Sequence, residues 1–67
     1  MSLTVVVTRN VHSRIRGFLA SSMLEVGPGV YTTTSLSAGA RERVWKVLEE
    51  WFEGGDTSIV MVWDDRM

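Results

Sequence analysis

Arginine side chains near the start of the chain are the residues whose placement suggests chemistry. Residues 1–24 contain Arg9, Arg14 and Arg16, together with His12, and no acidic residue. Guanidinium groups bind phosphate, and local positive potential, rather than total charge, decides whether a surface attracts DNA. The net charge of −1 therefore does not exclude nucleic-acid binding. From charge alone, an ordinary solvated surface accounts for the pattern equally well.

Four arginines are candidates for contact with DNA phosphates. Arg14 and Arg16 lie two residues apart in a predicted helix, about 200° apart around its axis, and so border its apolar stripe on two sides. They cannot share one narrow groove unless the first turn is irregular. Arg9 follows a predicted strand near the same helix start, where free amides favour phosphate. Arg41 falls toward the apolar side of a second predicted helix, where it could bind DNA or cap a carbonyl group.

No combination of side chains forms a convincing catalytic or metal-binding set. His12 has no acidic cluster near it, and the chain contains no cysteine. Asp64 and Asp65 would point to opposite faces of a strand. Ser21 and Ser22 have no paired base to activate them. We therefore expect no catalytic residue, no metal ligand and no cofactor.

Six predicted elements must position these side chains within one domain, residues 1–67. The pattern predicts strands at 3–8 and 57–63, helices at 11–24 and 38–53, and a hairpin of 23–26 and 30–34 around the Gly27-Pro28-Gly29 turn. The order strand, helix, strand, strand, helix, strand is typical of ferredoxin-like folds. We therefore expect an α+β fold with an antiparallel sheet and both helices on one face.

Local signals indicate where the helices begin and end. Asn10 and Ser37 are predicted N-caps, because their side-chain oxygens can accept hydrogen bonds from the free amides of the first turn. Gly54-Gly55 is predicted to end the second helix in the left-handed conformation. Glu42 and Lys46 form a favourable i,i+4 ion pair. Gly17 should destabilise the first helix by about 1 kcal/mol relative to alanine.

Tryptophan contributes most of the bulk available for a core. The second helix has a broad apolar face made of Val44, Trp45, Val47, Leu48, Trp51 and Phe52. Trp45, Trp51 and Trp63 could stack on bases. At this spacing on an apolar face, core packing is the favoured interpretation.

The first and last strands are apolar on both faces. Leu3, Val5 and Val7 share one face, Val6 lies on the other, and residues 59–63 are apolar without interruption. The two helices cover one face of the sheet, and the chain has no further helix for the other. A 67-residue domain is also marginal by itself. We therefore expect a partner subunit against the second face.

Targeting signals are missing from the sequence. No basic region precedes the apolar run at residues 3–7, which is too short for a secretory core. No stretch approaches the roughly 20 apolar residues of a membrane-spanning helix. We expect a cytoplasmic protein with no membrane partner.

Several segments, taken together, resemble a known family. They are residues 4–11 (TVVVTRNV), 14–17 (RIRG) with 19–20 (LA), 24–31 (LEVGPGVY), 37–38 (SA) with Arg41, Glu42 and Trp45, and 60–63 (VMVW). Their order and spacing resemble the type I-E branch of CRISPR-associated protein two, the small spacer-acquisition subunit of bacterial CRISPR systems. The resemblance implies a homodimer that binds a duplex DNA prespacer between integrase subunits, with Arg14 and Arg16 at positions that contact the DNA backbone.

The sequence departs from this family in two places. Members of this branch usually continue past the fourth strand into another strand and a tail that docks the integrase, whereas this chain stops at Met67. The resemblance therefore implies a C-terminally short member. Other branches carry an aspartate at the end of the first strand, where paired carboxylates could hold a divalent metal. Thr8-Arg9-Asn10 stands there instead, which favours a scaffold over a nuclease.

Two other functions remain as alternatives. One is a metal-dependent endoribonuclease or deoxyribonuclease, as other family branches are labelled, which would require Mg²⁺. The other is an unrelated ferredoxin-like binding module. An RNA-binding module of this kind needs exposed aromatic residues on its central strands. Tyr31 is the single tyrosine of the chain, so this interpretation has little support.

Overall fold

The computed structural model describes residues 3–64 as six elements in the predicted order. They are β1 (Thr4–Arg9), α1 (Ser13–Ser22), β2 (Leu24–Gly27), β3 (Val30–Thr33), α2 (Ala38–Trp51) and β4 (Ser58–Trp63). Within these residues, neither helix combines the length and apolar character needed to span a membrane.

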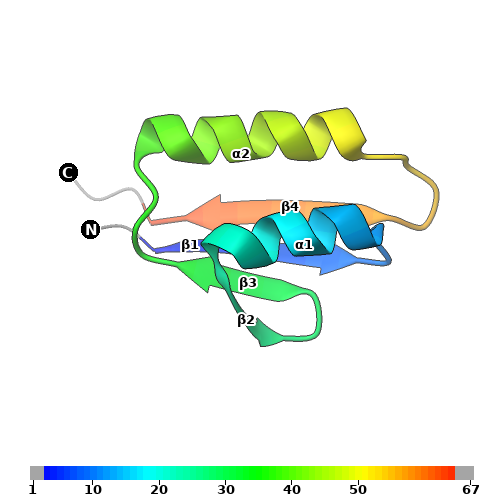
Figure 1. The fold of residues 1–67 in the computed structure, drawn as a ribbon, viewed down its shortest axis with the longest axis horizontal. Coiled ribbons are helices and arrows are strands. Elements are labelled where there is room, and N and C mark those ends of the chain that lie inside the picture. Colours follow the sequence, from blue (N-terminus) through cyan, green and yellow to red (C-terminus); the bar gives the residue numbers. More distant parts are fainter. Residues whose placement is uncertain (1–2, 65–67) are drawn as a thin grey trace.

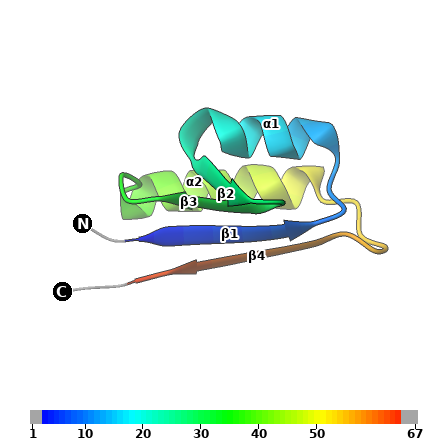
Figure 2. The ribbon, with the colours of Figure 1, turned by 90° about the horizontal axis from the view of Figure 1, so that it is seen from below.

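The strands form one antiparallel sheet in the order β2-β3-β1-β4 (Figure 1). β1 is therefore central and pairs with both β3 and β4. Figure 2 shows both helices on the same side of the sheet, with the opposite side of β1 and β4 left uncovered. The predicted α+β class and the ferredoxin-like arrangement are confirmed.

Pleating of β1 decides which of its residues enter the core. Thr4, Val6 and Thr8 face the helices and are buried. Val7 lies on the opposite face of the strand and is 42% exposed. The helices, the hairpin and β1 together form a buried apolar core of Val6, Ile15, Leu19, Met23, Tyr31, Val44 and Leu48. β1 thus contributes one apolar residue to this core, and its other valines lie on the uncovered face.

The two helices begin at different kinds of cap. Ser37 caps α2 as predicted, and its hydroxyl accepts a hydrogen bond from the Ala40 amide at 3.1 Å. The prediction for α1 is wrong, because His12 is the N-cap and its Nδ1 accepts from the Arg14 amide at 3.2 Å. Asn10 adopts a φ of 57° instead, in the turn that leads out of β1.

The end of α2 also differs from the prediction. The helix ends at Trp51, and the following Phe52 has an extended backbone. Gly54 and Gly55 have positive φ angles of 79° and 67°, but they belong to the turn toward β4 rather than to the cap. The Glu42–Lys46 ion pair is confirmed at 3.9 Å, with both side chains largely exposed.

Gly29 lies where the β2–β3 turn approaches the end of β1. Its φ is 75°, and an added Cβ would lie 2.6 Å from the Thr8 carbonyl oxygen. We expect Gly29→Ala to lower the free energy of unfolding by about 2–3 kcal/mol, since both the clash and the left-handed backbone are unfavourable. Thermal or urea unfolding followed by circular dichroism measures this effect.

Gly17 provides the matched control. A Cβ there meets no atom within 4 Å, and the residue lies inside α1. Gly17→Ala should therefore stabilise the protein by up to about 1 kcal/mol through helix propensity. Equal effects of the two substitutions would contradict the close approach of Gly29 to Thr8.

Candidate nucleic-acid interface

Arg9 and Arg16 line one hollow at the end of β1. Its volume is about 440 Å³, and its walls are Thr8, Arg9, Asn10, Val11, Arg16, Pro28 and Gly29. The Thr8 amide and hydroxyl both donate to the Gly29 carbonyl oxygen, at 2.7 and 3.0 Å. These bonds fix the turn against the strand, so two exposed arginines from different elements border one concave surface.

Arg14 has a different environment from Arg16. Its guanidinium lies over the ring of Trp51, 4.5 Å from the centroid. The same ring meets Phe18 edge-on, with centroids 5.6 Å apart. Arg14 therefore lies at the contact between α1 and α2. The structure separates Arg14 from Arg16, as the spacing on the helix predicts.

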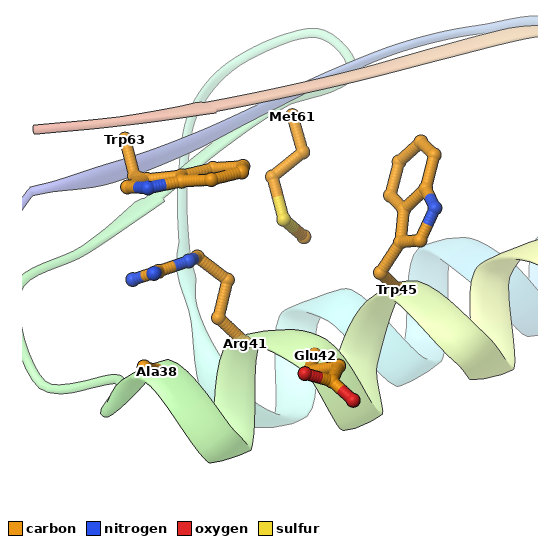
Figure 3. A pocket seen from close by; sticks show the side chains of 6 residues that line it. All are labelled: Ala38, Arg41, Glu42, Trp45, Met61 and Trp63. Carbon is orange, nitrogen blue, oxygen red and sulfur yellow. The ribbon is translucent and has the colours of Figure 1, made fainter. Parts of the chain in front are cut away.

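Arg41 lies over the ring of Trp63, 4.3 Å from its centroid. Figure 3 shows this pair in the hollow between α2 and β4, with Met61 and Trp45 beside it. The hollow has a volume of about 450 Å³ and is lined by Ala38, Arg41, Glu42, Trp45, Met61 and Trp63. Stacking on tryptophan thus takes one face of the guanidinium and leaves its edge N–H groups for a further acceptor.

The tryptophans are less buried than the sequence predicts. Trp45 and Trp51 are half-buried and pack against the core. The core prediction for Trp63 is wrong, because it is 47% exposed at the end of β4. Sequence reasoning missed both arginine–tryptophan pairs, which join different elements and leave no local spacing signal.

The other residues considered for catalysis, metal binding or base stacking either have a structural role or lie outside the described residues. His12 caps α1, and the Asp64 amide donates to the Leu3 carbonyl oxygen at 2.9 Å. Asp65 lies outside the described residues. Tyr31 is fully buried, so it offers no surface on which RNA bases could stack. Within residues 3–64, no three His, Cys, Asp or Glu side chains are grouped to hold a metal ion.

A comparison with protein families decides the relationship of the chain. The family model described as CRISPR-associated protein (Cas_Cas2CT1978) matches residues 3–67. The chain belongs to this CRISPR-associated Cas2 family. The resemblance seen in its sequence is therefore confirmed at the level of the family, and the protein is a CRISPR-associated protein.

The uncovered sheet face of this Cas2 family member is apolar across several strands. Register places Val30, Val7 and Val60 side by side on β3, β1 and β4. A second row contains Thr32, Val5 and Val62, and Leu24 on β2 extends it. Val60 and Val62 are 52% and 53% exposed. The predicted two-sided apolar strands are present, and no helix or strand among residues 3–64 covers the second side.

Proposed function

We propose that this protein is a homodimeric DNA-binding scaffold in the adaptation step of a type I-E CRISPR system. Two copies pack through their sheets, the dimer binds a duplex prespacer, and integrase subunits at its ends perform the chemistry. Membership of the Cas2 family supports a role in CRISPR function. The observation that carries the dimer is the apolar sheet face, which has no cover within the described chain.

An apolar face of this kind is unfavourable on a small monomer. Its exposed members are Leu3, Val7, Leu24, Val60 and Val62. Contiguous exposed apolar surface marks an interaction site more often than scattered single residues do. A second copy supplies the same face, and self-complementary packing about a twofold axis is the commonest form of homodimer.

The arginines supply the proposed contact with DNA. Arg9 and Arg16 border one hollow, while Arg14 and Arg41 lie on tryptophan rings elsewhere on the same chain. A dimer presents each group twice. Phosphate contacts fix the position of a duplex without reading its sequence, which suits a protein that accepts prespacers of varied sequence.

Duplex binding should depend strongly on salt. Four to eight phosphate contacts per dimer predict a slope of about −4 to −7 for the logarithm of the binding constant against the logarithm of salt concentration. Fluorescence anisotropy with a labelled duplex, repeated from low to physiological salt, measures this slope. A duplex that stays intact with Mg²⁺ agrees with the scaffold, whereas Mg²⁺-dependent cleavage by the purified protein supports the nuclease alternative. Binding that is insensitive to salt contradicts the proposal.

A further inference from the structure

His12 caps α1 through a nitrogen that can also bind a proton. Its Nδ1 accepts a hydrogen bond from the Arg14 amide at 3.2 Å, and its carbonyl oxygen accepts from the amides of Ile15 and Arg16 at 3.0 and 3.3 Å. An imidazole nitrogen accepts only while it carries no proton, and the imidazolium donates from both of its nitrogens. The side-chain part of this cap therefore exists only when His12 is neutral.

The charged groups on α1 and at the end of β1 are positive. Arg9 ends β1, and Arg14 and Arg16 lie on α1, whose first turn has no acidic residue. The free amides at the start of a helix add a partial positive charge. A proton on His12 would thus remove the acceptor of the cap and place a cation among like charges.

Carboxylates on the elements around His12 lie on β2, near the end of α2 and in the loop that follows α2. They are Glu25, Glu49, Glu50, Glu53 and Asp56. Glu25 accepts a hydrogen bond from a backbone amide of its own turn at 3.0 Å, which holds its carboxylate there. Among residues 3–64, none of the five forms an ion pair with His12. The described chain therefore offers an imidazolium at this position no carboxylate within ion-pair distance.

We propose that protonation of His12 releases the first turn of α1, so that the start of this helix responds to pH. A histidine side chain ordinarily changes its charge between pH 5 and 8. The cap stabilises the fold in the upper part of that range and is lost as the pH falls, because the proton competes with the Arg14 amide for Nδ1. Ser37 caps α2 with a hydroxyl that does not titrate in this range, so its hydrogen bond from the Ala40 amide is kept. The device therefore acts on α1 and leaves α2 unchanged.

Urea unfolding at two pH values tests the proposal, because His12 is the single histidine of the chain. His12→Ser supplies a cap that does not titrate, and His12→Ala supplies no cap. From about pH 8 to about pH 5.5, the unfolding equilibrium constant of the unmodified protein should rise about fivefold relative to that of His12→Ser, as loss of an N-cap predicts. His12→Ala should differ from His12→Ser by about the same factor at both pH values. A ratio of unmodified protein to His12→Ser that does not change with pH overturns the proposal.

Amide resonances of the two helix caps give a readout that a general loss of stability does not move. Nitrogen-15 spectra of the unmodified protein at about pH 8 should show Nδ1 of His12 without a proton, and the Arg14 amide proton should shift upfield as the pH falls to about 5.5. The Ala40 amide, which donates to the Ser37 hydroxyl, is the internal control and should not shift. A proton on Nδ1 at about pH 8, or an equal shift of both amides, overturns the proposal.

Salt separates loss of the cap from simple repulsion between positive charges. At about 1 M salt the Debye length falls to about 3 Å, so repulsion between an imidazolium and the arginines is screened, whereas the missing acceptor is not restored. The pH-dependent change in the unfolding constant should therefore persist at this salt concentration. Its disappearance overturns loss of the cap as the cause. Neither measurement uses DNA, so the outcome is independent of the proposed DNA-binding function.

Discussion

Val60→Lys should convert the protein from a dimer to a monomer. Val60 lies on the open sheet face beside Val7, in a row that continues to Val30. In the proposed dimer, an ammonium group there would be buried without a partner, which costs several kcal/mol. A loss of about 3 kcal/mol weakens the dimer more than 100-fold. Analytical ultracentrifugation over a range of protein concentrations measures the dissociation constant.

The control for this experiment adds the same charge elsewhere. Ala20 is exposed on α1, on the helical side of the sheet, so Ala20→Lys should leave the dimer intact. Val62→Thr offers a milder change on the open face, because threonine keeps the shape of valine and its preference for strands. It should weaken the dimer by a smaller factor. A wild-type chain that is a stable monomer at micromolar concentration contradicts the proposed dimer.

Hydrophobic periodicity is enough to predict the order and type of the elements. Alternation along β1 and the apolar stripe of α2 are local patterns, and the structure follows both. The cap of α1 is harder to predict, because Asn10 and His12 can both accept a hydrogen bond from a helix start. The geometry of the turn after β1 decides between them, and this turn is held by the hydrogen bond from the Thr57 hydroxyl to the Asn10 carbonyl oxygen.

The candidate site could be predicted only in part. Positions i and i+2 of a helix lie about 200° apart around its axis, and this rotation correctly predicts that Arg14 and Arg16 lie on different sides of α1. The shared hollow of Arg9 and Arg16 depends on how the β2–β3 turn meets β1, through a contact that spans 21 positions of the chain. The stacking of Arg41 on Trp63 joins the start of α2 to the end of β4. Such contacts follow from the fold and have no local sequence signal.

Leu48→Ala should unfold much of the protein at room temperature. Leu48 is 1% exposed and, with Val44, is one of the two buried residues of α2. Truncating a buried leucine costs about 2–5 kcal/mol, because apolar contacts are lost and a cavity remains. A domain of this size has little stability to lose. Urea unfolding measured by tryptophan fluorescence and circular dichroism gives the change in free energy.

The loss of stability in Leu48→Ala should be large because α2 has hollows on both sides of Trp45. One lies toward Trp63, and the other is lined by Trp45, Leu48, Glu49, Phe52, Ser58 and Ile59. Leu48 itself borders the second hollow, so its loss joins existing space to a new cavity. Val47→Ala removes a half-buried side chain from the same helix and should cost about 1 kcal/mol or less. Equal costs for the two substitutions would show that α2 is not anchored to the sheet through Leu48.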